Sequence, residues 1–224
     1  MTNDWTVDDL LAALPDEDDY PIAGGAMLRA SWAGSCDRVV SYRVQRVEPS
    51  DPLPLSLRFA FAVGHAVHDV VQAGLGVLYP EGEAEKEGVL ESNTRTWRPF
   101  PLVGFHADYW RPGGGGTVTE IKTMQTFAFS KARHEGVQPW HLAQAGIAAL
   151  GLSASVVEIV YVDKAKGDMD VYRFPWDEFA PVARHAVHSM MRAATAELGE
   201  RIDPNRQHWR CRSCQYYTRC GQDG

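Results

Sequence analysis

The sequence lacks several features that would place it outside the ordinary globular proteins. Its N-terminus has none of the basic residues of a secretory or transit peptide, and no uninterrupted apolar run approaches the ~20 residues of a membrane span. It also lacks internal repeats, long low-complexity tracts and the Gly-x-x-x-x-Gly-Lys-Ser/Thr loop that cradles nucleotide phosphates. We therefore expect a soluble, cytoplasmic protein with no ATPase of its own and no membrane partner.

Basic residues are absent from residues 1–20, which hold only acidic charges. These are Asp4, Asp8, Asp9, Asp16, Glu17, Asp18 and Asp19. The 224-residue chain has a formal net charge of -7, so the rest of the chain balances at zero. A negative total argues against a nucleic-acid partner, but its confinement to the leader removes that objection. We expect an acidic leader over residues 1–20 and a single domain over 21–224, since 45% hydrophobic content can build one core.

The sign of the charge reverses near the C-terminus. Residues 201–220 contain five arginines against one aspartate, with aromatic residues between them. Arginine interleaved with aromatics suits phosphate contacts and base stacking, although a solvated arginine-rich tail has the same composition. The candidate nucleic-acid contacts are Arg206, Arg210, Arg212 and Tyr216.

Hydrophobic periodicity and turn residues predict alternating helices and strands. The expected helices are 6–14, 27–45, 57–75, 139–150 and 176–198, of which 57–75 is expected to be largely buried. The expected strands lie within 87–110 and at 117–123, 153–162 and 169–174, with a turn at Gly113–Gly116. This order predicts an α/β layer fold with a central mixed sheet flanked by helices.

Two carboxylates and a lysine are expected to meet at one edge of the strand hairpin. Asp108 ends one strand, while Glu120 and Lys122 lie two apart on the next and so share a face. Paired carboxylates can hold Mg²⁺ or Mn²⁺, and a lysine can stabilise developing phosphate charge. A Glu-x-Lys pair is also common on a solvated strand face, but Ile121 between them indicates a core strand. His68 adds a nitrogen ligand that favours Mn²⁺ over Mg²⁺.

The order and spacing of these residues resemble the RecB-like branch of the PD-(D/E)xK nucleases. The matching motifs are Gly64-x-x-x-His68, Gly104-Phe105-His106-Ala107-Asp108, Glu120-Ile121-Lys122 and Gln144. The resemblance spans about residues 30–220 and implies a restriction-endonuclease-like core. It implies that the metal ligands are His68, Asp108, Glu120 and the carbonyl of Ile121, and that Asp108, Glu120, Lys122 and Gln144 are the catalytic residues.

Two positions near Gln144 bear on this resemblance. The family often has a tyrosine four residues after that glutamine, where this chain has Ala148. His141, three residues before it, occupies a position where the family often has an aromatic residue or histidine. The departure at Ala148 puts a DNA contact from that position in doubt.

Four cysteines form the remaining motif, Cys211-x-x-Cys214-x5-Cys220 together with Cys36 far upstream. In a reducing compartment four cysteines favour metal ligation over disulfides, and four thiolates suit zinc or an iron–sulfur cluster. A zinc ribbon normally has two local pairs, and free structural cysteines are the third reading. The split arrangement resembles that of the CRISPR-associated family-four nucleases and AddB-type nuclease domains, which implies a 4Fe-4S cluster.

Together the motifs lead us to expect a metal-dependent DNA exonuclease acting in recombination, repair or processing. The resemblance implies single-stranded DNA as substrate, degradation from 5′ to 3′, and a helicase or recombination protein as partner. The source implied is a prokaryotic cell or a phage-infected host. Two alternatives are a DNA-binding or assembly module without strong catalysis, and a structure-specific endonuclease of the same fold.

Overall fold

The computed structural model describes residues 22–92 and 101–223. By their contacts the residues form two compact units. The larger comprises Pro21–Ser35 and Val67–Arg192, and the smaller joins Cys36–Ala66 to the chain from Ala193 onward. Two such units can belong to one folding domain, so the single domain expected over 21–224 stays a prediction. The acidic leader and the helix expected over 6–14 lie outside the described residues.

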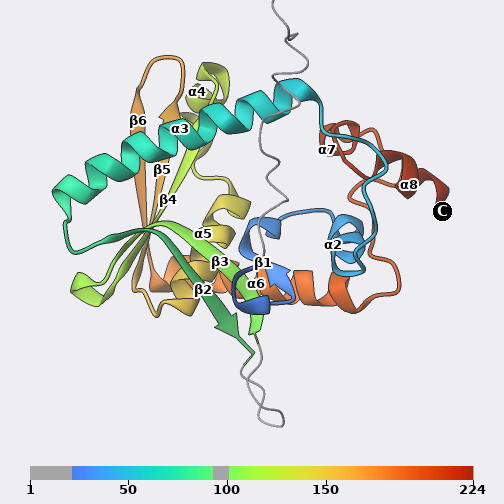
Figure 1. Cartoon of the computed structure of the whole chain (residues 1–224), viewed down its shortest axis with the longest axis horizontal. Helices are drawn as coiled ribbons and strands as arrows, with labels where there is room; N and C mark the ends of the chain where they lie inside the picture. The colour runs from blue at the N-terminus through green and yellow to red at the C-terminus, as the bar shows by residue number, and fades with distance from the viewer. Residues whose placement is uncertain (1–21, 93–100, 224) are drawn as a thin grey trace, which may run out of the picture. The chain divides into compact units, whose positions relative to one another are not determined.

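The larger unit is built on a six-stranded mixed sheet (Figure 1). Its strands are β1 (Leu28–Arg29), β2 (Glu83–Glu91), β3 (Pro101–Arg111), β4 (Thr117–Met124), β5 (Val156–Asp163) and β6 (Met169–Pro175). The strand order is β1-β3-β4-β5-β6. β1 and β4 pair with different parts of one edge of β3, and β2 pairs with the opposite edge. The β1–β3 and β4–β5 pairs are parallel and the others are antiparallel. This confirms the expected α/β class with a mixed sheet.

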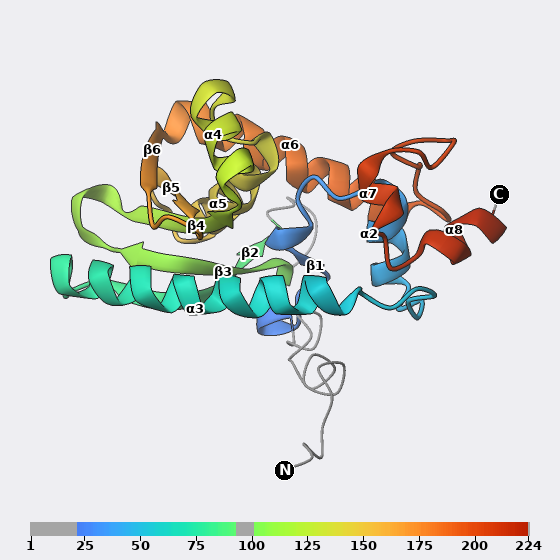
Figure 2. The ribbon, with the colours of Figure 1, turned by 90° about the horizontal axis from the view of Figure 1, so that it is seen from above.

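Helices cover both faces of the sheet in the larger unit. They are α3 (Leu55–Leu78) from Val67 onward, α4 (Thr126–Glu135), α5 (Pro139–Gly151) and most of α6 (Trp176–Thr195). Short 3-10 turns lie at η2 (Ala23–Gly25), η3 (Ala30–Trp32) and η4 (Gly113–Gly115). Figure 2 shows α3 on one side of β4 and β5, with α4 and α5 on the other. Val67 and Val71 of α3 pack on a buried cluster of Ile121, Val160 and Val162.

Most of the expected elements are confirmed with small shifts at their ends. The strand at 117–123 and the helix at 139–150 are present, and η4 makes the expected turn at Gly113–Gly116 with positive φ at three of its glycines. The helix expected over 176–198 ends at Thr195 instead. Residues 93–100, inside the stretch expected to form strands, lie outside the described residues. Helix α4 was not predicted from the sequence.

Two expectations about helices are wrong. Within residues 27–45 the only α-helix is α2 (Asp37–Val44), preceded by the short 3-10 helix η3, because Leu28 and Arg29 pair with β3 and Gly34 has a φ of 74°. The helix predicted at 57–75 exists as α3 but is not largely buried. Within it only Gly64 and Gln72 are buried, because a single face of the helix meets the sheet. Helix α3 therefore carries more apolar residues than its contacts with the other described residues bury.

Helix α3 holds no long uninterrupted apolar run, yet its length and composition resemble those of a membrane span. Its 24 residues are long and apolar enough to cross a membrane by length and composition alone. A single helix of this kind is weak evidence, because a core helix of a soluble protein passes the same test. Polar residues interrupt its apolar ones, which is why a search for unbroken runs missed it.

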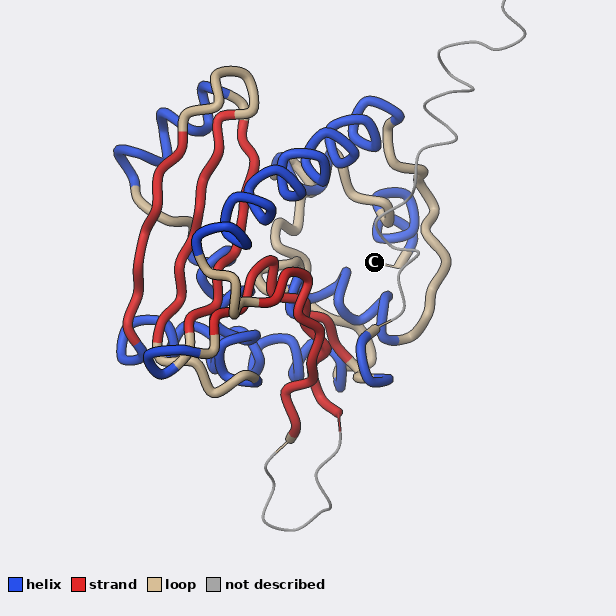
Figure 3. The backbone as a smooth tube through the Cα atoms, turned by 60° about the vertical axis from the view of Figure 1, so that its left-hand side comes forward, coloured by secondary structure: helices blue, strands red, loops and turns tan. Residues whose placement is uncertain are grey.

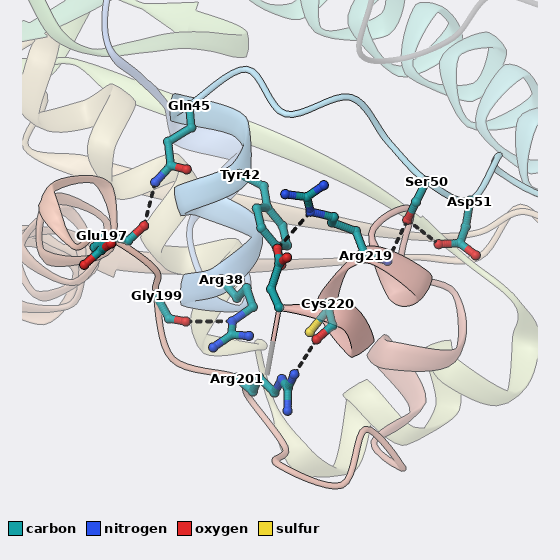
Figure 4. Close-up of polar contacts among 11 residues, drawn as sticks. Arg38, Tyr42, Gln45, Ser50, Asp51, Glu197, Gly199, Arg201, Arg219 and Cys220 are labelled. Carbon is teal, nitrogen blue, oxygen red and sulfur yellow. Dashed lines mark hydrogen bonds and ion pairs between the residues drawn. The ribbon is translucent and has the colours of Figure 1, made fainter.

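The smaller unit joins α2 to the C-terminal helices α7 (Trp209–Arg212) and α8 (Tyr217–Gln222). Figure 4 shows side chains of α2 reaching the chain that follows α6. Arg38 Nε donates to the carbonyl of Gly199 at 2.9 Å, and Gln45 Nε2 donates to that of Glu197 at 2.9 Å. The Tyr42 hydroxyl donates to Asp223 at 2.8 Å. Segments from both ends of the chain thus fold together.

Candidate metal and nuclease site

The candidate site lies at a fork between β3 and β4. One edge of β3 pairs with β1 at Val103 and Gly104, and then with β4 from Tyr109 to Arg111. Between these points the described strands form no ladder on that edge. Figure 3 shows β3 leaving β4, β5 and β6 at this place. Where two strands separate, their backbone and side-chain groups are not paired with each other as they would be in a continuous ladder, so other groups can bind them.

Asp108 lies in this fork. Its side chain is 13% exposed, and Oδ2 accepts a hydrogen bond from the Ile121 backbone N–H at 2.5 Å. The carboxylate thereby accepts a backbone hydrogen bond that the carbonyl of a neighbouring strand would otherwise accept. Gly104 starts the same motif for a steric reason: a Cβ there would lie 3.0 Å from the backbone oxygen of Ala23. In this motif Gly104 allows close packing, and Asp108 contributes the carboxylate of the candidate site.

Glu120 is the most deeply buried acid of the site, with 1% of its surface exposed. Lys122 Nζ lies 2.7 Å from Glu120 Oε1 as an ion pair. Neither carboxylate oxygen has a hydrogen-bond partner of normal geometry among the described residues. Burial raises the pKa of Glu120 to about 7, with Lys122 opposing the shift and Asp108 adding to it. A buried carboxylate with unfilled acceptor sites suits a bound cation.

His68 of α3 brings a nitrogen to the same place. Its Nδ1 lies 3.6 Å from Asp108 Oδ1. Burial acts to lower the pKa of His68, but the hydrogen bond and negative charge of Asp108 outweigh it and raise that pKa. The structure therefore brings His68, Asp108, Glu120 and Lys122 together, as the sequence predicts. An incoming cation would compete with the proton on His68.

The residues present fit a hard divalent cation. Two carboxylates with one imidazole form the oxygen-rich set that Mn²⁺ and Mg²⁺ prefer. As placed, no three His, Cys, Asp or Glu side chains within residues 22–92 and 101–223 are positioned to hold a metal ion. Two of the acids are engaged otherwise, Asp108 with the Ile121 N–H and Glu120 with Lys122. Ligation through the Ile121 carbonyl stays a prediction.

Gln144 approaches the site from α5, on the face of β4 opposite to Ile121. Its Oε1 accepts a hydrogen bond from Lys122 Nζ at 3.2 Å. Lys122 is thus held between Glu120 and Gln144, which places the predicted glutamine beside the predicted lysine. Ala148 of the same helix is fully buried, so a side chain at that position faces the core.

Gln72 is a further site residue that the sequence did not single out. Its amide donates to the backbone oxygen of Asp108 at 2.9 Å and also contacts Glu85. It lies four residues after His68 on α3, so helical spacing could have revealed it. His106, part of the Asp108 motif, lies with Nε2 3.1 Å from a Glu87 carboxylate oxygen. Gln72 therefore anchors α3 to β3 where the predicted metal ligands meet.

The four cysteines all belong to the smaller unit, and none forms a disulfide. Burial raises the pKa of the Cys211 thiol, and Cys36 and Cys220 add to the shift. Burial likewise raises the pKa of Cys214, to which the other three cysteines contribute. Cys211 and Cys214 therefore lie within electrostatic reach of Cys36 and Cys220. A metal centre shared by the four cysteines stays a prediction, because no three of them within residues 22–92 and 101–223 are placed to hold a metal ion.

Backbone N–H groups point at two of the sulfurs. Ile202 N donates to Cys36 Sγ at 3.3 Å, and Tyr216 N donates to Cys214 Sγ at 3.4 Å. Hydrogen bonds of this kind stabilise thiolates that ligate a metal. Cys36 precedes α2, and the other three lie in or between α7 and α8. The surroundings of the cysteines thus fit either zinc or an iron–sulfur cluster.

The C-terminal residues expected to contact nucleic acid differ in their surroundings. Tyr216 is 5% exposed and stacks 5.1 Å from the Tyr42 ring, so it presents little surface to a base. Arg206 lies over the Tyr217 ring and donates to its backbone oxygen at 3.0 Å. Arg212 is exposed. DNA contacts from Arg206, Arg210 and Arg212 stay predictions.

Comparison with known proteins places the fold. No family model and no curated protein matches the sequence. The crystal structure of SSO0001 is similar, with a TM-score of 0.62 and 20% identity over 93% of each chain. The alkaline exonuclease LHK-Exo from Laribacter hongkongensis covers 76% of this chain and 88% of its own at 12% identity, with a TM-score of 0.49. Its complex with dAMP has a TM-score of 0.50 and 12% identity over 75% of this chain and 85% of that one.

At these identities the likeness concerns the fold alone. The chain has an α/β fold in which helices flank a central mixed sheet, and this fold is similar to that of SSO0001 and of LHK-Exo in its complex with dAMP. The acids, histidine and lysine at the fork of this sheet form its candidate site.

Proposed function

We propose that the chain is a metal-dependent deoxyribonuclease that hydrolyses phosphodiester bonds from the end of a DNA strand. The observation that carries the proposal is Glu120, a buried carboxylate with unfilled acceptor sites, beside Asp108, His68 and Lys122. Burying this carboxylate is costly even with Lys122 beside it, because its remaining acceptor sites are unfilled. The similarity to the fold of an exonuclease supports the same reading.

The residues divide into two groups by their chemistry. His68, Asp108 and Glu120 would hold Mn²⁺ or Mg²⁺, which supplies Lewis-acid chemistry to a phosphate and a water. Lys122 brings positive charge to the place where negative charge develops on the phosphate. Gln144 keeps the Lys122 ammonium in position through its 3.2 Å hydrogen bond. Single-stranded DNA, 5′ to 3′ polarity and a recombination or helicase partner in a prokaryotic or phage-infected cytoplasm complete the proposal.

A 4Fe-4S cluster held by Cys36, Cys211, Cys214 and Cys220 forms the second part of the proposal. The electrostatic influence of Cys36 and Cys220 on the Cys211 and Cys214 thiols and the N–H···S hydrogen bonds support it. Its role is mechanical, because it would join α2 to the C-terminal helices. Zinc is the competing occupant, which elemental analysis of purified protein distinguishes.

A cleavage assay on linear and circular single-stranded DNA tests the nuclease assignment. We expect linear strands to be shortened to mononucleotides or short fragments in Mn²⁺, and EDTA to abolish the reaction because the site then lacks its cation. Circular single strands are expected to stay intact, since they offer no end. Cutting of circles would identify an endonuclease, and binding without cleavage would identify a DNA-binding module.

The affinity of the site for Mn²⁺ is expected to rise with pH. Glu120, with its pKa raised to about 7, is protonated below that value and must lose the proton to bind a cation. The raised pKa of His68 acts in the same direction. Calorimetric titration with MnCl₂ should therefore show at least roughly tenfold weaker binding near about pH 6 than near about pH 8, with release of protons. Equal affinity at both pH values would contradict the assignment of these ligands.

A further inference from the structure

Tyr161 of β5 lies next to the candidate site and is absent from the sequence-based predictions. It is in register with Lys122 of β4 and is fully buried. Its hydroxyl accepts the backbone N–H of Gln138 at 3.0 Å and lies 2.9 Å from Nδ1 of His141. The rings of Tyr161 and His141 meet edge to face with centroids 5.6 Å apart. The hydroxyl thus links β5 to the first turn of α5.

These two contacts fix which nitrogen of His141 carries the proton. A buried hydroxyl needs an acceptor for its own proton, and Gln138 N–H offers only a donor. Among the described residues, His141 Nδ1 is the acceptor that the Tyr161 hydroxyl has. Neutral His141 then carries its proton on Nε2, on the side of the ring away from Tyr161. The tyrosine therefore leaves His141 with a directed N–H donor.

The position of this donor relates it to the candidate site. His141 and Gln144 lie three residues apart on α5 and so share a side of the helix. Gln144 holds Lys122, whereas His141 is partly exposed. We propose that His141 contacts substrate by donating its Nε2–H to a phosphate oxygen of the bound DNA strand. Tyr161 is the positioning residue that sets its tautomer. The inference rests on the proposed nuclease function and names a further contact to the DNA.

A matched set of variants separates this role from simple packing of α5 on the sheet. His141→Gln keeps an N–H donor near the place of Nε2, whereas His141→Asn keeps a polar group near Tyr161 but loses that donor. Tyr161→Phe removes only the hydroxyl. We expect His141→Asn to weaken binding of a single-stranded oligonucleotide by about 10-fold or more, and His141→Gln to restore most of it. Binding is measured on the Glu120→Gln background, which keeps the strand intact.

A substrate walk identifies the phosphate. Oligonucleotides with one uncharged methylphosphonate linkage are compared at each position in turn. At one linkage the methylphosphonate should weaken binding to the protein that has His141. The same methylphosphonate should weaken binding to His141→Asn by much less. Nitrogen-15 NMR of wild-type protein should show a protonated Nε2 on His141, a preference that Tyr161→Phe loses.

The outcomes distinguish this inference from the nuclease assignment. Equal penalties in both proteins at every linkage, with Glu120→Gln inactive in Mn²⁺, would overturn the role of His141 and leave the nuclease intact. A wild-type protein that neither binds nor cuts DNA would overturn both. Loss of binding in His141→Gln as severe as in His141→Asn would assign the residue to packing, which likewise overturns the proposal.

Discussion

Glu120→Gln is expected to reduce the rate of Mn²⁺-dependent DNA cleavage by at least about 10³-fold, because a buried anionic metal ligand supplies several kcal/mol of charge stabilisation. The substitution keeps the shape of the side chain and removes its charge. Burial already disfavours that charge, as the pKa raised to about 7 shows, so the variant should stay folded. The measurement is single-turnover cleavage of a labelled single strand, with thermal unfolding followed in parallel.

Glu135→Gln is the matched control for this variant. Glu135 is an exposed residue of α4, paired with Lys131 at 3.7 Å, and lies outside the candidate site. Its cleavage rate should equal that of the wild type. Full activity in Glu120→Gln would refute the assignment of the metal site. Equal loss in both variants would point instead to a general effect of removing an acid.

The chemistry of the site could be predicted from the sequence because it depends on short spacings. Glu120 and Lys122 share a face because a strand alternates its side chains, whatever else the sheet does. Asp108 could be placed beside them because a glycine-rich turn joins the two strands. In the structure these three residues and His68 lie close together.

The parts that were missed depend on contacts between distant segments. Tyr161 lies beside Lys122 only because β4 and β5 pair in parallel in one register, which no local pattern encodes. Leu28 and Arg29 have helical neighbours in sequence, yet pairing with β3 makes them a strand. The apolar residues of α3 predicted burial, but hydrophobic periodicity shows which residues avoid water and not what covers them.

In the smaller unit, too, contacts between distant segments could not be predicted from local sequence patterns. The spacing of Cys211, Cys214 and Cys220 predicts a metal site, but Cys36, the predicted fourth ligand, is far away in sequence. Contacts of α2 with the chain after α6 bring Cys36 to that place, as with Ser41 Oγ donating to the Ala193 carbonyl at 2.6 Å. In the sequence this link was available only through the family resemblance. The structure supplies a physical reason for it.

If the proposed centre is present, Cys214→Ser is expected to lower the thermal stability of the smaller unit substantially and to release the metal. A centre shared by the four cysteines would join segments from both ends of the chain, so its loss would free a long loop in the way that removing a disulfide does. By that comparison the loss is about 2–5 kcal/mol, or roughly 10 °C or more in the unfolding midpoint. Circular dichroism on heating measures the midpoint, while iron, sulfide and zinc analysis identifies the lost centre.

Ser213→Ala provides the control, because Ser213 is the exposed neighbour of Cys214 and changes nothing at the sulfur atoms. It should keep the wild-type midpoint and metal content. Zinc in place of iron and sulfide would replace the cluster by a tetrahedral site and leave the mechanical role standing. An unchanged midpoint in Cys214→Ser would refute that role. Because His68, Asp108, Glu120 and Lys122 all belong to the larger unit, DNA cleavage by folded Cys214→Ser at low temperature should persist if the cluster acts only to hold the chain together.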